Sequence, residues 1–314
     1  MKQHKIDISI VIPVFYSSGI FSVLYSRLVK TLENIDKSFE IIAVVDGCTD
    51  GSAEVIAGIN AQDPRVKLIE FSRNFGNQMA ITAGLKCSAG DMVVIMDDDL
   101  EDPPEVIPEL IDKAVEGFDL VYAVRKKREI SWLKNTVFKS YYKFLNILSN
   151  YDFPSNTGDF CLMKRPIVDV LNAMPESHRY IRGLRSWVGF KQTGIEFYRE
   201  SRHSGESGFN VLKYFKFASD GIFSFSDMPL KLIAYLGFFI SLASFLFAIV
   251  LIVARLEGVL PDVQGWASTV VIILFIGGVQ LFSIGVLGQY IGRIYDEVKS
   301  RPPYIIKRSL GLEE

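Results

Sequence analysis

The sequence predicts an α/β domain with a mostly parallel sheet, followed by two membrane-spanning helices. Short β-branched and aromatic runs alternate with helical stretches over residues 8–124, a pattern typical of parallel sheets covered by helices. Two long apolar runs follow at residues 232–254 and 266–291. Since an acidic run at residues 97–102 comes directly after a strand-like segment, we expect metal-dependent chemistry at a membrane surface.

The sheet domain is predicted from runs that are too short for helices and rich in strand-forming residues. We expect strands at residues 8–15, 39–45, 66–71, 92–96 and 120–124, and helices at 23–32, 52–61 and 105–116. In open α/β sheets, ligands bind outside the carboxyl ends of the strands. Asp46, the acidic run and Arg125 each follow a predicted strand, and this convergence predicts a site at that edge.

The acidic run has the chemistry of a metal site. Asp97 and Asp99 point to the same side of an extended segment, so both can reach one hard divalent cation. Mg²⁺ or Mn²⁺ held in this way would neutralise a diphosphate. A solvated acidic turn is the alternative, but the apolar run at residues 93–96 favours a buried strand that delivers the carboxylates to the active edge.

Residues 46–52 have the form of a strand end, a tight turn and a helix start. Asp50 is expected to be structural, and either Asp50 or Ser52 is expected to cap the following helix, because both residue types are favoured caps. Asp46, at the strand tip, is placed to hydrogen-bond a base or a ribose. Pro13, Val14 and Phe15, at the tip of the first strand, would form the floor of the same pocket.

The two apolar runs are each long enough to cross a membrane, which takes about 20 residues. The loop between them carries Arg255 against Glu257 and Asp262. The flanks are basic: Lys213, Lys216 and Lys231 precede the runs, and Arg293, Lys299, Arg301, Lys307 and Arg308 follow them. By the positive-inside rule, both ends of the chain are expected in the cytoplasm.

Two basic amphipathic segments, about 131–149 and 209–223, are predicted to lie in the headgroup layer as interfacial helices. Packing on the protein's own core is the alternative. The net charge of −2 indicates no partner by itself, and no nucleic acid is expected. The polar residues 1–7 do not resemble a signal peptide. Cys48, Cys87 and Cys161 have no metal-ligand spacing and are expected to be reduced thiols.

Several motifs together resemble the family 2 glycosyltransferases. They are Ile10-Val11-Ile12-Pro13-Val14-Phe15, Val45-Asp46-Gly47, Ser72-Arg73-Asn74-Phe75-Gly76 and the acidic run followed by Pro103-Pro104-Glu105. More narrowly, the chain resembles the polyprenyl-phosphate glycosyltransferases, which include dolichol-phosphate mannose synthase and bacterial glucosyl and aminoarabinosyl relatives. Residues 288–293 and 301–304 resemble the bacterial members with two spanning helices. The resemblance implies a glycosyltransferase A-type, Rossmann-like sheet.

The resemblance also implies roles for individual residues. The metal ligands would be Asp97, Asp99 and Glu101, with Glu101 where the family usually has Gln. The nucleotide sugar would contact Pro13, Val14, Asp46, Asp97, Asp98 and Arg202, and the acceptor phosphate would contact Arg125, Arg128, Lys139 and Arg199. Asp159, Asp99 and Arg202 would be catalytic, with Asp159 near the donor sugar. Relatives often have Lys where Gly208 stands, so one basic contact is expected to be missing.

The implied reaction is inverting transfer of a sugar to polyprenyl (undecaprenyl) phosphate at the inner membrane, on its cytoplasmic face. UDP-glucose is the expected donor, with UDP-aminosugars or GDP-mannose as alternatives. We expect a catalytic domain with interfacial helices at residues 1–229, spanning helices at 230–292, a tail at 293–314, and a homo-oligomer. A non-catalytic nucleotide-sugar-binding subunit stays open, as does a polysaccharide synthase, although the chain has no Gln-x-x-Arg-Trp motif.

Overall fold

The computed structural model describes residues 6–125, 157–177, 179–197, 228–257 and 265–312. The chain forms two compact units. The sheet unit comprises Met1–Ile147, Tyr151–Tyr214 and Arg301–Glu314, and the helical unit comprises Leu148–Asn150 and Phe215–Ser300. The predicted interfacial helices at 131–149 and 209–223 lie outside the described residues.

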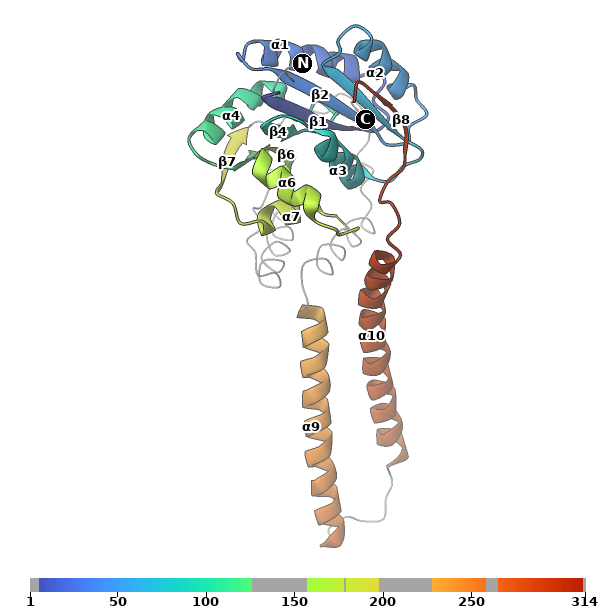
Figure 1. Ribbon diagram of the computed structural model, residues 1–314. Coiled ribbons are helices and arrows are strands. Elements are labelled where there is room, and N and C mark those ends of the chain that lie inside the picture. Colours follow the sequence, from blue (N-terminus) through green and yellow to red (C-terminus); the bar gives the residue numbers. More distant parts are fainter. Residues whose placement is uncertain (1–5, 126–156, 178, 198–227, 258–264, 313–314) are drawn as a thin grey trace. The chain divides into compact units, whose positions relative to one another are not determined.

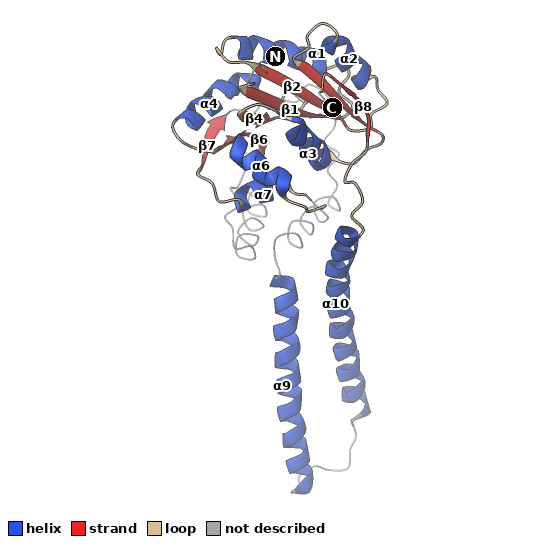
Figure 2. Ribbon diagram, viewed as in Figure 1, coloured by secondary structure: helices blue, strands red, loops and turns tan. Residues whose placement is uncertain are grey.

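The sheet unit is built on one mixed sheet (Figure 2). Its strands are β1 Ile8–Val14, β2 Phe39–Val45, β3 Val66–Phe71, β4 Met92–Ile95, β5 Leu120–Arg125, β6 Thr157–Lys164, β7 Gln192–Phe197 and β8 Ile306–Leu310. Their order is β7-β5-β6-β4-β1-β2-β3-β8. The pairs β1–β2, β1–β4, β2–β3 and β5–β7 are parallel, whereas β6 and β8 pair antiparallel with their neighbours. This confirms the predicted α/β class and mostly parallel sheet.

Helices cover both faces of this sheet (Figure 1). They are α1 Phe21–Glu33, α2 Ser52–Asn60, α3 Asn77–Cys87, the 3-10 turn η1 Pro104–Val106, α4 Ile107–Val115, α6 Arg165–Ala173 and α7 Ile181–Trp187. Because successive side chains point to opposite faces of a sheet, β2 contributes to the cores on both faces. Ile41 and Ala43 pack with α1, α2 and α4, whereas Ile42 and Val44 pack with α3.

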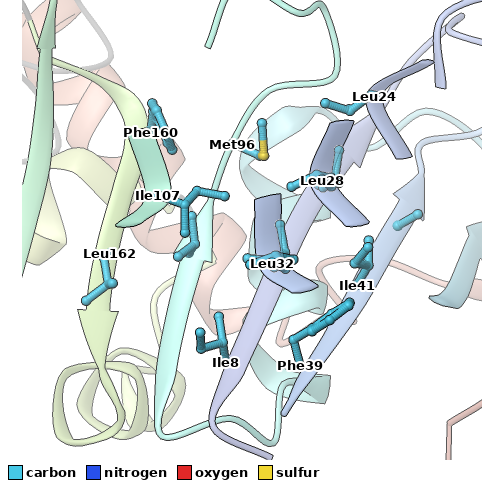
Figure 3. Close-up of a cluster of buried hydrophobic side chains, with 14 of the residues drawn as sticks. Ile8, Leu24, Leu28, Leu32, Phe39, Ile41, Met96, Ile107, Phe160 and Leu162 are labelled. Atoms are coloured by element: carbon cyan, nitrogen blue, oxygen red, sulfur yellow. The ribbon is translucent and has the colours of Figure 1, made fainter. Parts of the chain in front are cut away.

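The larger core lies between the sheet and the helices α1, α2 and α4, and Figure 3 shows the part beside α1. Leu24, Leu28 and Leu32 recur every four residues along α1 and are fully buried, because this spacing places them on one helical face. They pack with Ile8 of β1 and Ile41 of β2. This packing fixes β1 and β2, whose carboxyl ends border the candidate site.

The helical unit contains α9 Met228–Leu256 and α10 Trp266–Val298. Leu230–Leu251 and Thr269–Val298 are long and apolar enough to cross a membrane, with mean hydropathy of 2.4 and 2.6 and no buried residues in their apolar windows. A core helix of a water-soluble protein would bury such a surface. The exposure therefore favours lipid as the surroundings of both helices.

After α10 the chain returns to the sheet. Strand β8 pairs antiparallel with β3, and the Ser72 N–H donates to the Ile305 carbonyl at 3.0 Å. Tyr304 stacks on Phe71, with ring centroids 5.0 Å apart. Sequence patterns do not predict this strand, since residues 293–314 read as a tail after the second span.

Candidate active site

The predicted polar residues converge at one edge of the sheet. The parallel strands β1, β2, β3 and β4 end there. Strand β6 runs antiparallel to β4, with Ile95 opposite Cys161, so its first residues lie at the same edge. This register places Asp159 of β6 beside Asp97, which follows β4.

Asp98 joins the loop after β4 to the loop after β1. Its Oδ2 accepts hydrogen bonds from the Phe15 N–H at 3.0 Å and the Ser17 hydroxyl at 2.5 Å. Pro13 and Val14 are buried within β1, whereas Phe15 and Tyr16 at the strand tip are 51% and 56% exposed. The two exposed rings, 4.7 Å apart, are therefore the surface that the β1 tip offers to a ligand.

Asp46 holds the loop after β3. Its Oδ1 accepts from the Phe75 N–H at 2.6 Å, and its Oδ2 accepts from the Gly76 N–H at 2.8 Å. Gly47 lies against the same loop, with φ of +65° and no room for a side chain. Asp46 thus shapes the predicted nucleotide pocket through its neighbours, and an acceptor lone pair on each oxygen is left for a ligand.

Asp50 has the structural role that the sequence indicates. It accepts from the backbone N–H of Ser52 at the start of α2, at 3.2 Å, and from the N–H of Ser18 at 3.1 Å. It therefore ties the start of α2 to the loop after β1 and stabilises the pocket from outside.

Four carboxylates form the centre of the site: Asp97, Asp99, Asp102 and Asp159. Burial raises the pKa of Asp97 well above its usual range, and the negative charges of Asp102 and Asp159 raise it further. Burial also raises the pKa of Asp102, although Arg125 opposes this shift. Because the negative charges of these carboxylates repel one another, a cation bound among them would stabilise their ionised forms.

Arg125, at the end of β5, is turned toward this acidic centre. Its Nη2 lies 3.4 Å from Oδ1 of Asp102, whose side chain is fully buried. A side chain at Gly158 would come within 3.0 Å of the same guanidinium. Arg125 therefore balances the charge of Asp102, and its predicted contact with an acceptor phosphate stays a prediction.

Asp159 is paired with an arginine that the sequence did not single out. Arg182 of α7 donates from Nε to Oδ1 at 2.8 Å and from Nη2 to Oδ2 at 3.0 Å. Asp102, also missed, could have been noticed as the last acid before Pro103-Pro104. No local sequence pattern marks Arg182, because its partner lies 23 residues away in the chain.

The donor set suits a hard divalent cation. Within the described ranges, no group of three or more His, Cys, Asp and Glu side chains could hold a metal ion. Mg²⁺, however, is usually held by one or two carboxylates together with substrate phosphates. Asp97 and Asp99 offer carboxylates that suit this mode of binding, and one oxygen of the buried Asp102 has no hydrogen-bond partner. The residues therefore fit a cation whose coordination a bound diphosphate completes.

Of the other predicted site residues, one is described by the structure and four are not. Glu101 is buried, and its backbone N–H donates to Asp99 at 3.1 Å. Arg128, Lys139, Arg199 and Arg202 lie outside the described residues. Their roles stay predictions.

The chain is similar to several known proteins. The family model for glycosyl transferase family 2 matches residues 9–171. An uncharacterized glycosyltransferase of Synechocystis is 44% identical over 310 residues, covering 98% of this chain and 97% of the relative. A prophage-derived bactoprenol glucosyl transferase of Shigella flexneri is 42% identical over 303 residues, covering 96% and 98%. Glucosyl-3-phosphoglycerate synthase from Mycobacterium tuberculosis, solved with Mn²⁺ and UDP, superposes with a TM-score of 0.48 at 15% identity, covering 69% and 77%.

Proposed function

The chain belongs to glycosyl transferase family 2, and we propose that it transfers glucose from UDP-glucose to a polyprenyl phosphate, with inversion at the anomeric carbon. The observation that carries this proposal is the alignment with a bactoprenol glucosyl transferase over 96% of the chain. An alignment of that extent includes the apolar helices as well as the sheet. The likeness therefore concerns the combination of a sugar-transfer domain and a membrane anchor.

In the proposed reaction, an oxygen of the lipid phosphate attacks the anomeric carbon, and the bond from that carbon to the diphosphate breaks. UDP leaves with the bonding electron pair. A phosphate monoester has a second pKa of about 6, so the acceptor is largely ionised at neutral pH and needs no strong base. Asp159 would orient the sugar or balance charge in the transition state.

A divalent cation, Mg²⁺ or Mn²⁺, would be held by Asp97 and Asp99, with Glu101 nearby. When bound, it would stabilise the negative charge that develops on the leaving diphosphate. Arg202 is proposed to support the same charge. Asp98 keeps the loop after β1 in place and so would shape the pocket for the nucleotide.

The metal proposal is tested with charge-matched variants. Asp97→Asn and Asp99→Asn should each lower turnover by orders of magnitude, whereas Asp112→Asn, on the exposed side of α4, should not. Initial rates are measured with Mg²⁺, with Mn²⁺ and in chelated buffer. Near-normal rates for both site variants without metal would remove the cation from the mechanism.

The proposed location is the bacterial inner membrane, with the sheet unit and both ends in the cytoplasm. This orientation is supported by the basic residues on both outer flanks of the apolar helices. A cytosolic nucleotide sugar could then reach the site directly. The lipid-linked product would form on the cytoplasmic leaflet.

The donor is tested with a panel of radiolabelled nucleotide sugars offered to the purified full chain with polyprenyl phosphate. Label from UDP-glucose should enter the organic phase. Label from GDP-mannose or a UDP-aminosugar instead would replace the donor but keep the reaction class. No labelled lipid from any donor, with nucleotide binding retained, would favour the binding-subunit alternative.

A further inference from the structure

Helix α7 brings two arginines to the first residues of β6. Arg182 and Arg185 are three positions apart and so lie on one face of the helix. Arg185 is buried and donates to main-chain carbonyls, to Gly158 at 2.8 Å and to Asp159 at 3.3 Å. Arg185 therefore binds α7 to the main chain of β6 and contacts no carboxylate there.

The second arginine makes a different contact. Arg182 binds both carboxylate oxygens of Asp159 through two parallel hydrogen bonds, the geometry that fixes orientation as well as distance. The Asp159 side chain is 5% exposed and that of Arg182 is 26% exposed. The pair thus lies at the border between the core and the active edge.

The electrostatics agree with this geometry. Burial alone would raise the pKa of Asp159, but the charge and hydrogen bonds of Arg182, together with the charges of Arg185 and Arg125, lower the pKa. The carboxylate is therefore ionised at neutral pH. Each carboxylate oxygen already accepts one hydrogen bond, so the orientation of the carboxylate is fixed. Its remaining lone pairs therefore point in defined directions toward a substrate hydroxyl.

We infer that Arg182 is a positioning residue for glycosyl transfer, which holds the Asp159 carboxylate in the orientation that contacts the donor sugar. This inference rests on the proposed function. Arg185 already secures α7 to β6, so the bidentate contact of Arg182 is not needed for that purpose. The register of β6 against β4 places Asp159 beside Asp97, so Arg182, through its contact with Asp159, lies next to the carboxylates of the candidate site.

The start of α7 is also held by α3. The Ile181 N–H donates to Oε1 of Gln78 at 2.8 Å. Arg182 is the next residue, so its backbone has a defined position before the side chain is placed. A short helix with both of these restraints can hold a guanidinium with little freedom.

The test uses Arg182→Lys, which keeps the charge but loses the bidentate contact, and Arg182→Gln. With the donor and acceptor each varied, kcat should fall by about a hundredfold, as expected for a misplaced catalytic group, while KM for the lipid is unchanged. Thermal unfolding of the same samples shows how much protein is folded. Unchanged kcat per folded protein in both variants would overturn the inference.

A double variant separates positioning from a structural role. If Arg182 acts through Asp159, then Arg182→Gln combined with Asp159→Asn should be no slower than Asp159→Asn alone. Multiplicative losses would overturn the inference. The neutral amide pair also leaves no unpaired buried charge, so it is the variant most able to fold. Absence of transfer by the wild-type chain with every donor would instead overturn the proposed function, and this inference with it.

Discussion

A methyl group added at Gly47 should disturb the donor pocket without touching any predicted ligand-binding side chain. An ideal Cβ at this position would lie 2.2 Å from the Arg73 carbonyl carbon and 2.3 Å from the Asn74 nitrogen. Carbon atoms in favourable contact are about 3.5–4.0 Å apart. One of the two loops must therefore move by more than about 1 Å, and the hydrogen bonds of Asp46 to the loop after β3 would be lost.

The size of the effect follows from these contacts. A non-glycine residue at positive φ costs roughly 1–2 kcal/mol. Hydrogen bonds to a charged group contribute about 1.5–3 kcal/mol each, and Asp46 makes two of them. We expect Gly47→Ala to lower the free energy of unfolding by about 3–5 kcal/mol, because part of the loss is relieved by relaxation.

Gly51→Ala is the matched control. Gly51 has φ of +86° and no heavy atom within 4 Å of an added Cβ, so only the conformational cost of roughly 1–2 kcal/mol applies. The assay compares thermal unfolding midpoints and kcat/KM for the donor in detergent-solubilised full chain. Gly47→Ala should have the lower midpoint and a kcat/KM reduced by about a hundredfold. Equal values for the two variants would refute the argument that the loops are in contact.

Three further outcomes are expected. Tyr304→Ala should lower the thermal midpoint and Tyr304→Phe should not, because a stacked ring pair contributes about 0.5–1.5 kcal/mol; equal midpoints would argue against the stack. Hydrogen bonds from Arg65 lower the pKa of Asp63, so its stabilisation is present above an unfolded pKa of about 3.9 and is lost as pH falls through the folded pKa. Asp63→Asn should therefore destabilise at neutral pH, with a difference from wild type that shrinks in acid. A cysteine at Asp262 should react with an impermeant thiol reagent in intact cells, whereas one at Glu314 should react only after lysis.

The strands that the sequence predicts are those with an uninterrupted β-branched run. The expected ranges 39–45 and 66–71 coincide with β2 and β3, and the other three predicted strands differ by one residue at the carboxyl end. These strands are buried on both faces, so their composition alone identifies them. Helix α3 is not predicted, because continuous burial also hides the pattern of a helix. Its buried positions run continuously from Ala80 to Leu85, which removes the periodicity that identifies a helix.

The positions of candidate residues at the sheet edge could be predicted where chemistry and local sequence coincide. Asp97 and Asp99 stand out because they follow a buried strand directly, and Asp46 because it precedes a Gly turn, whereas their roles as ligands stay predictions. The pairing of Asp159 with Arg182 could not be found in this way, since it depends on how α7 packs against β6. The same is true of Asp98, whose bonds to the β1 loop span more than 80 residues of sequence.

The pairing of strand β8 bears on membrane topology independently of the positive-inside rule. Glu70 of β3 is buried and forms ion pairs with Lys307 at 2.6 Å and Arg308 at 3.0 Å, so β8 is bound to the sheet by charge as well as by its strand pairing. A single sheet lies on one side of a membrane, because strand edges and ion pairs are costly in lipid. If the apolar helices cross a membrane, the chain must leave and re-enter on the same side, which requires an even number of spans between β7 and β8. Helices α9 and α10 would meet this requirement as a pair. Labelling of Glu314→Cys from outside intact cells would then place the whole sheet outside and contradict the proposed orientation, whereas labelling of Glu314→Cys but not of an exposed cysteine at Asp112 would contradict the pairing of β8.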